Sequence, residues 1–104
     1  MTRNRNRYGN SFSEETKKAV WNKAQIIAGY DSNKIRKEHC GAWIHWDKHG
    51  DTTENGNGWE IDHIKPVSKG GGDELSNLQP LQWQNNRKKG DEYPASNYCI
   101  VSGT

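Results

Sequence analysis

One segment of the chain, residues 59–91, constrains the possible folds more than any other. It begins with the β-rich stretch WEIDHI, continues through the glycine-rich PVSKGGGDELSN, and ends with LQPLQWQNNRKKGD. Consecutive glycines followed by an aspartate are typical of a loop, while basic residues followed by Gly90 are typical of the end of a short helix. The segment therefore predicts a strand, a loop and a helix, in that order.

The same segment contains side chains that are suited to phosphate chemistry. Asp62 is a hard anionic ligand, His63 is a base that titrates near neutrality, and Asn86 is a neutral oxygen ligand. These are the roles that a one-metal phosphodiesterase site requires. Because neighbouring side chains of a strand point to opposite faces, Asp62 and His63 can reach one phosphate only if the strand ends or bends there, which Pro66 favours. Glu60 shares the strand face of Asp62 and is expected either to support the site or to pair with a lysine.

Further elements are predicted upstream of this segment. The stretch SEETKKAVWNKAQIIAG is typical of an amphipathic helix with Ser13 as its cap and Gly29 at its end. Asp31 is expected to cap a second short helix that ends near Gly41. Residues 42–46, AWIHW, have the composition of a strand, and the polar, glycine-rich turn after them predicts an antiparallel hairpin with WEIDHI.

The hydrophobic core must be small, because only 30% of the 104 residues are apolar. Five tryptophans are therefore expected to supply much of the buried area. The sequence contains neither a run of about 18 apolar residues nor an apolar leader, which predicts a cytoplasmic protein, with export by a dedicated secretion system left open. The two cysteines, Cys40 and Cys99, are too few for a disulfide scaffold, so we expect reduced thiols.

The charge is distributed unevenly along the chain. Residues 1–40 contain nine Lys or Arg against four acids, while residues 41–104 contain six against nine. A basic half is typical either of a polyanion-facing surface or of an ordinary solvated face. Residues 1–10 alternate Arg and Asn without an apolar period, which predicts a flexible basic arm that either lies along a phosphate backbone or is a free tail. The remaining residues, 11–104, are expected to form a single domain with its core at about 42–91.

The motifs of this chain resemble those of the HNH endonucleases. The resemblance rests on a DHIxP segment, a GGxD turn, an NLQPL segment and a final NxxKGD, all in order and closely spaced. It implies an α+β fold, a small single domain in which an antiparallel hairpin and a short helix form a ββα-metal finger beside the N-terminal helix. Asn86 stands where the family name expects a third histidine, which makes this an HNN variant.

A second departure concerns the structural zinc that many relatives hold with two CxxC pairs. The matching positions read Cys40-Gly-Ala-Trp43 and Gln82-Trp-Gln-Asn85, so only one of the four thiols remains. A Cys₄ zinc site cannot form from these residues, and no structural zinc is expected. Aromatic packing by Trp43 and Trp83 is expected to take its place.

The resemblance also implies a role for each residue of the motif. His63 would be the general base, while Asp62 and Asn86 would hold one divalent cation, for which the oxygen ligands favour Mg²⁺ with Mn²⁺ as a substitute. Asn77, counted with His63 in the catalytic set, would tie the glycine loop to the backbone near that histidine. The basic residues around the site are expected either to contact flanking phosphates or to be ordinary solvated charges. They are Lys65, Lys69, Arg87, Lys88 and Lys89.

The function implied is a metal-dependent endonuclease that hydrolyses phosphodiester bonds in DNA. Two alternatives stay open: a non-catalytic nucleic-acid-binding module, and an antibacterial nuclease toxin that an immunity protein neutralises. A partner in a larger phage or restriction assembly is a further possibility, and no membrane partner is expected. No pattern of a helix-turn-helix, zinc finger or repeat lies outside the core, so we expect weak sequence preference.

Overall fold

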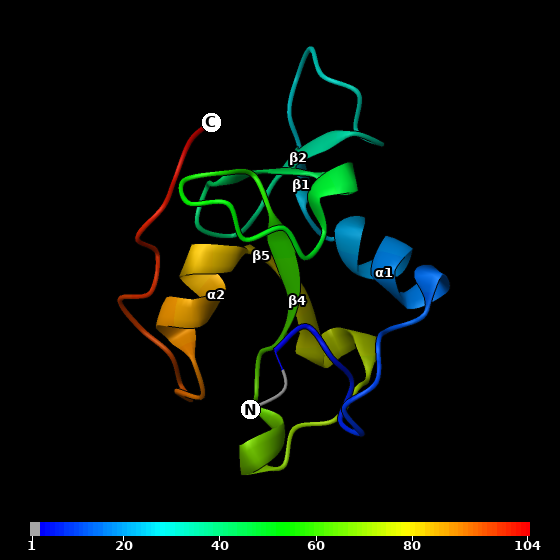
Figure 1. Ribbon diagram of the computed structural model, residues 1–104, viewed down its shortest axis with the longest axis vertical. Coiled ribbons are helices and arrows are strands. Elements are labelled where there is room, and N and C mark those ends of the chain that lie inside the picture. The colour runs from blue at the N-terminus through cyan, green and yellow to red at the C-terminus, as the bar shows by residue number, and fades with distance from the viewer. Residues whose placement is uncertain (1–2) are drawn as a thin grey trace.

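The computed structural model describes residues 3–104, and within them the chain folds into two helices and two small antiparallel sheets (Figure 1). The elements in chain order are α1 Glu14–Trp21, β1 Gln25–Ile26, β2 Ile35–Lys37, β3 Trp43–His45, β4 Trp59–His63, β5 Leu78–Gln82 and α2 Trp83–Lys89. Short 3₁₀ turns cover Trp46–Lys48, Val67–Lys69 and Leu75–Asn77. The predicted α+β class is confirmed. Neither helix of the described residues is long and apolar enough to cross a membrane.

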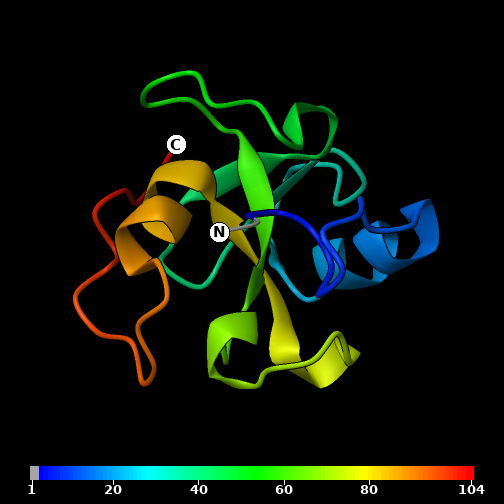
Figure 2. The ribbon, with the colours of Figure 1, turned by 60° about the horizontal axis from the view of Figure 1, so that its bottom comes forward.

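Strands β4 and β5 form the central hairpin, and α2 follows β5 without a break. The register pairs Trp59 with Gln82 and His63 with Leu78. In Figure 2 the two strands cross the middle of the molecule, with α2 on one side and α1 on the other. This hairpin and helix form a ββα unit.

The partner of β4 differs from the sequence prediction, which paired WEIDHI with residues 42–46. No strand was predicted at residues 78–82, which contain a proline, Pro80, that cannot donate a ladder hydrogen bond. In the structure β5 is an edge strand paired only with β4, where a proline is tolerated. The segment at 42–46 instead supplies β3, which pairs with β2 in a separate three-stranded sheet, with Ile44 opposite Arg36.

The predicted second helix after Asp31 is wrong, since residues Ile35–Lys37 form strand β2. Asp31 does organise a turn, because its carboxylate accepts a hydrogen bond from Asn33 N and its carbonyl accepts one from Ile35 N. The chain then continues as a strand and turns the buried Arg36 inward. Its guanidinium donates to three carbonyl oxygens, those of Ser32, Asn22 and Ala24.

These contacts also explain why α1 is shorter than predicted. Ser13 caps its start by accepting a hydrogen bond from Thr16 N, as expected, but the helix ends at Trp21 rather than near Gly29. Arg36 binds the carbonyl oxygens just beyond the helix end, and residues Gln25–Ile26 pair with β2 as strand β1. A long-range contact from another element thus ends the helix, against its local pattern.

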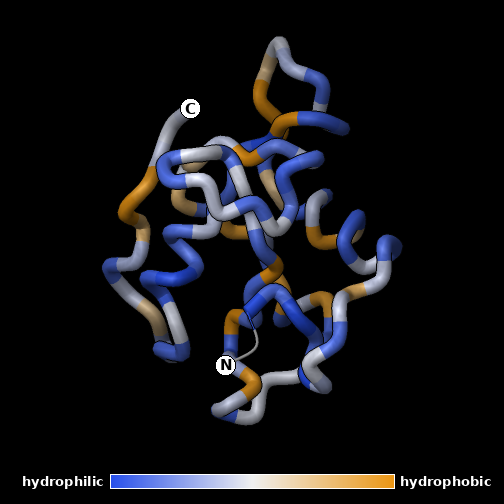
Figure 3. Tube along the Cα trace, in the orientation of Figure 1, coloured by the Kyte–Doolittle hydropathy of each residue, from blue (hydrophilic) through white to orange (hydrophobic). Residues whose placement is uncertain are grey.

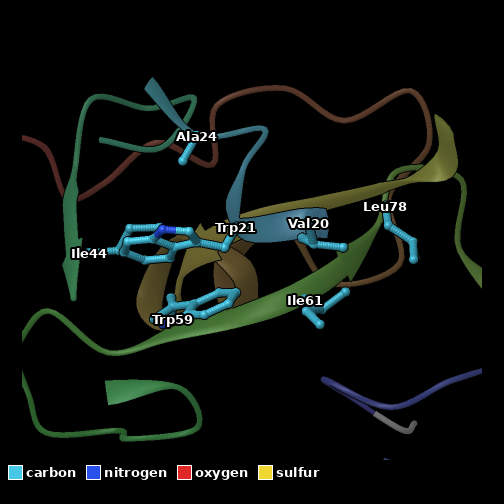
Figure 4. Packing of buried hydrophobic residues seen from close by; sticks show 7 residues of the cluster. All are labelled: Val20, Trp21, Ala24, Ile44, Trp59, Ile61 and Leu78. Carbon is cyan, nitrogen blue, oxygen red and sulfur yellow. The ribbon is translucent and has the colours of Figure 1, made fainter. Parts of the chain in front are cut away.

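The core lies between α1 and β4 and is built around two tryptophans (Figure 4). Trp21 and Trp59 are completely buried, with ring centroids 5.3 Å apart. The other members of the cluster are Val20, Ala24, Ile44, Ile61 and Leu78. The remaining three tryptophans are only partly buried. Figure 3 shows hydrophobic stretches that are short and separated by hydrophilic chain, in keeping with a small core.

The expectation of reduced thiols is wrong, since Cys40 and Cys99 form a disulfide. The bond ties the C-terminal tail to the turn before β3, and a short parallel bridge between Ala42 and Gly103 continues the attachment. Two cysteines that are distant in sequence gave no spacing pattern from which to predict this pair. Disulfides are more common in oxidising compartments than in the cytoplasm, and the cytoplasmic localisation stays a prediction.

The positions that match the zinc-binding thiols of relatives are joined by a polar network. The buried carboxylate of Glu38 accepts hydrogen bonds from Ala42 N, Gln82 N and Asn85 Nδ2. The two tryptophans expected to pack there make other contacts: Trp43 packs on Tyr30, and Trp83 donates its ring N–H to the carbonyl of Thr53. Glu38, together with the disulfide, therefore connects the segments that zinc connects in relatives.

Candidate active site

A pocket of about 340 Å³ lies where β4 ends, beside α2. It brings together the three residues on which the sequence placed the chemistry, Asp62, His63 and Asn86. The strand ends at His63, which removes the difficulty that adjacent strand residues face opposite ways. The other lining residues are Arg3, Asn4, Ile61, Pro66, Val67, Ser68, Gly90 and Asp91.

Asp62 is buried on the face of β4 that α2 covers. Its Oδ1 lies 3.2 Å from Lys89 Nζ, and its Oδ2 accepts a hydrogen bond of 2.9 Å from Gln79 Nε2. Burial raises the pKa of the Asp62 carboxyl, while the hydrogen bond from Gln79 and the charge of Lys89 act in the opposite direction. A cation bound beside this carboxylate would favour its charged form.

Asn86 is oriented by Glu60, which lies two residues before Asp62 on the same face of β4. The Nδ2 of Asn86 donates to Glu60 Oε1 at 2.9 Å, and Arg87 holds the other carboxylate oxygen at 3.1 Å. Because the amide nitrogen is committed to Glu60, the amide oxygen of Asn86 is the atom left for a ligand. Glu60 therefore contacts a residue of the predicted site, Asn86, and its ion pair is with Arg87 rather than with a lysine.

His63 has its ring held by a residue that sequence reasoning missed. Its Nε2 lies 2.7 Å from Asp73 Oδ1, and its ring lies 5.9 Å from that of Phe12, measured between centroids. With Nε2–H donated to a carboxylate, the lone pair of the neutral imidazole is on Nδ1. The signal for Asp73 was present in the GGxD motif, as an acid ten residues after the histidine.

Asn77 closes the loop between β4 and β5 and does not line the pocket. Its Oδ1 accepts from Lys65 N at 2.8 Å, and its Nδ2 donates to the carbonyl oxygens of Lys65 and Gly72. A side chain on Gly71 would collide with the carbonyl oxygen of Lys65, so the loop needs a glycine there. The loop thus places Asp73 under His63, and the catalytic importance of Asn77 stays a prediction.

The five predicted phosphate-contact residues differ in their surroundings. Lys65, Lys69 and Lys88 are exposed, and Arg87 is exposed while paired with Glu60. Lys89 is only 2% exposed, and its ammonium group binds Asp62 and the carbonyl oxygen of His63. The Lys89 ammonium group therefore makes buried contacts inside the site, unlike the four exposed basic residues.

The side chains of the pocket suit a cation with oxygen ligands. Among residues 3–104, no group of three or more His, Cys, Asp or Glu side chains converges to form a metal cage. What the pocket offers is one carboxylate, Asp62, and one amide oxygen, Asn86. Mg²⁺ is commonly bound through one or two protein oxygens, with water and substrate phosphate completing its coordination. This donor set therefore fits Mg²⁺ or Mn²⁺ better than a zinc ion with nitrogen and sulfur ligands.

Comparison with known proteins assigns the chain to a family. The family model for HNH endonucleases matches residues 38–92, which is more than half of the chain and includes β3, β4, β5 and α2. No curated protein and no solved structure matches. The matched range contains each of the motif residues described above, while the N-terminal segment and α1 lie outside it. On this match, the chain belongs to the HNH endonuclease family.

Proposed function

We propose that this protein is a metal-dependent endonuclease that hydrolyses phosphodiester bonds in DNA. Membership of the HNH family supports nuclease activity. The observation that carries the finer proposal is the convergence of Asp62, His63 and Asn86 on one pocket, with Asp73 bound to the far nitrogen of His63. A base, an acidic ligand and a neutral oxygen ligand then surround one position where a phosphate can sit.

In this mechanism His63 Nδ1 takes the proton from the water that attacks phosphorus. The carboxylate of Asp73, on Nε2, fixes the tautomer that leaves Nδ1 free and stabilises the imidazolium that forms. A positioned general base of this kind contributes about 10²–10⁴-fold to the rate. Asn77 acts indirectly, by holding the loop that carries Asp73.

Asp62 and Asn86 would hold the divalent cation, with Mg²⁺ as the working ion and Mn²⁺ as a substitute. When bound, this cation stabilises negative charge on the scissile phosphate and on the leaving 3′ oxygen. Glu60 keeps the amide oxygen of Asn86 turned toward the pocket, and Lys89 keeps Asp62 in place. Contacts to flanking phosphates are proposed for the exposed members of the basic set, Lys65, Lys69, Arg87 and Lys88.

The test is cleavage of supercoiled plasmid in Mg²⁺, Mn²⁺, Zn²⁺ or chelator. We expect nicked or linear product with Mg²⁺ and Mn²⁺, and none with chelator. Asp62→Ala, His63→Ala and Asn86→Ala should each lose at least about 10²-fold in rate. His39→Ala is the matched control, because this exposed histidine lies outside the pocket. If all three site variants cut as fast as the control, the site assignment is wrong; if they bind DNA and the wild type never cuts, the non-catalytic alternative holds.

A second candidate, an antibacterial nuclease toxin with an immunity protein, is favoured by the Cys40–Cys99 disulfide. Disulfides form and persist in proteins that work outside a reducing cytoplasm. Under this alternative, producing the wild-type chain in bacteria should stop growth, and the His63→Ala chain should not. Normal growth with fully active protein would exclude the toxin role and leave the nuclease proposal intact.

A further inference from the structure

We propose that the RNRNR segment, residues 3–7, is a built part of the active site that binds the DNA backbone next to the scissile phosphate. This inference rests on the nuclease function proposed above. The segment lies outside the range that matches the HNH family, yet its chain crosses β4 (Figures 1 and 2). Arg3 and Asn4 line the same pocket as Asp62, His63 and Asn86.

The asparagines of the segment hold it in place. The side-chain oxygen of Asn4 accepts a hydrogen bond of 2.8 Å from Ile61 N, on β4. The same oxygen lies 2.8 Å from His49 Nε2. Burial and the charge of Lys17 lower the pKa of His49 to about 4, so the neutral ring donates its Nε2–H to Asn4. One asparagine side chain thus satisfies two donors.

Asn6 and the backbone of Arg7 complete the attachment. Asn6 Oδ1 accepts from the amides of Tyr8 and Asn10, which closes a tight turn after the segment. The amide of Arg7 donates to both carboxylate oxygens of Asp73, at 3.1 and 3.2 Å. The segment is therefore tied to the carboxylate that holds His63, through its main chain rather than through an arginine side chain.

The arginines face outward where the asparagines face inward. Arg3, Arg5 and Arg7 are exposed, while Asn4 and Asn6 are half-buried. Within the described part of the chain none of the three guanidinium groups forms an ion pair; Arg5 donates to Ser11 Oγ and Arg7 stacks on Tyr8. Three cations in five residues without a carboxylate partner repel one another, and a polyanion relieves this repulsion.

Because the segment lies at the pocket, the polyanion we expect it to bind is a DNA backbone. The strand whose phosphate enters the pocket must continue past its rim, and Arg3 is part of that rim. Neighbouring phosphates repeat at short intervals along the strand and attract guanidinium groups whatever the base sequence. The alternation of Arg and Asn thus has a structural meaning: asparagines anchor the segment to β4 and to its own turn, and arginines remain available to phosphates.

The test compares two variants with the same loss of charge. One carries Arg3→Gln, Arg5→Gln and Arg7→Gln; the control carries Lys34→Gln, Lys37→Gln and Lys48→Gln, none of which lines the pocket. Both are made in the His63→Ala background, and their affinity for a short DNA duplex is measured by fluorescence anisotropy across a series of salt concentrations. Each lost phosphate contact lowers the slope of log affinity against log salt by about 0.9. We expect the arginine variant to lose about two to three units of slope, and the control less than one.

A second pair of variants tests the anchor. Asn4→Ala keeps all three arginines but removes the oxygen that binds Ile61 N, so its DNA affinity should fall at least about 10-fold, with faster hydrogen exchange at the Ile61 amide. Asn10→Ala is the matched control, since Asn10 takes part through its backbone. Thermal unfolding checks that both variants are folded.

The outcomes separate this inference from the proposed function. If the wild type cuts plasmid and the arginine and lysine variants have equal salt slopes, the inference is overturned while the nuclease function stands. If the slope falls only in the arginine variant but no protein cuts DNA, the segment binds DNA and the nuclease function fails. Strong binding of the segment to an acidic protein, without any arginine-dependent DNA binding, overturns the inference as well.

Discussion

Lys89 and Asp62 form an ion pair of 3.2 Å in which both side chains are almost completely buried. The pair joins α2 to β4 directly behind the pocket, and the Lys89 ammonium also donates to the carbonyl oxygen of His63. Removing one partner of a buried pair leaves an uncompensated charge in the interior. This relationship links the stability of the fold to Asp62, the carboxylate of the proposed metal site.

Lys89→Met is therefore expected to lower the free energy of unfolding by about 3 kcal/mol, because Asp62 loses its partner. Adding Asp62→Leu should restore part of the stability, since both charges are then gone. Urea denaturation measures both effects. Lys88→Met is the control, because Lys88 is the exposed neighbour on the same helix. Equal stability of the two lysine variants would show that the pair does not contribute.

Asp73→Ala is expected to lower kcat on the order of 10²-fold with little change in KM, because Asp73 holds the proposed base His63 and does not line the pocket. The tautomer of His63 is the decisive readout: ¹⁵N NMR should show Nε2–H in the wild type and a mixture in the variant. Glu74→Gln is the neighbouring control. An unchanged tautomer together with reduced kcat would point to a purely structural role for Asp73.

Stability is expected to fall between pH 6.5 and pH 4 because of His49. Its pKa is lowered from 6.5 to about 4 in the folded protein, so the unfolded chain binds the proton more readily. The contribution is complete above pH 6.5 and is lost as the pH falls toward 4. We expect a loss on the order of 1–2 kcal/mol, allowing for the partial exposure of the ring. His49→Gln should remove this part of the pH dependence; identical curves for both proteins would contradict the assignment.

Reduction of the Cys40–Cys99 disulfide is expected to lower the free energy of unfolding by about 2–4 kcal/mol, because the bond closes a loop with a sequence separation of 59. Urea unfolding with and without dithiothreitol measures this. The Cys40→Ser/Cys99→Ser variant should match the reduced wild type and ignore the reductant. A wild type whose midpoint does not move on reduction would rule out a stabilising bond.

Much of the ββα core could be predicted from residues 59–91, because its motifs combine local signals with fixed spacing. The strand WEIDHI, the glycine loop and the basic helix lie where the sequence placed them, and Asp62, His63 and Asn86 meet in one pocket. The pairing of β4 was wrong, and its partner strand at residues 78–82 was missed. That strand contains Pro80, which is disfavoured in a central strand but tolerated in an edge strand.

Other errors came from contacts between residues that are distant in sequence. Arg36 ends α1 early and keeps the following chain extended, although the local pattern favours helix. The disulfide partner of Cys40 could not be read from spacing, and the link from Asp73 to His63 depends on a loop closed by Asn77. In each case contacts between separate segments override or complete what the local sequence specifies.

Glu38 joins the turn before β3 to the start of α2, the two segments whose positions match the zinc-binding pairs named in the sequence comparison, and the nearby disulfide adds a covalent link. Zinc-dependent domains unfold when a chelator removes their metal. In this protein a chelator should affect activity, and a reductant should affect stability. EDTA should leave a folded protein without activity, whereas dithiothreitol should leave an active protein that unfolds more easily, so that catalysis and folding can be switched off independently.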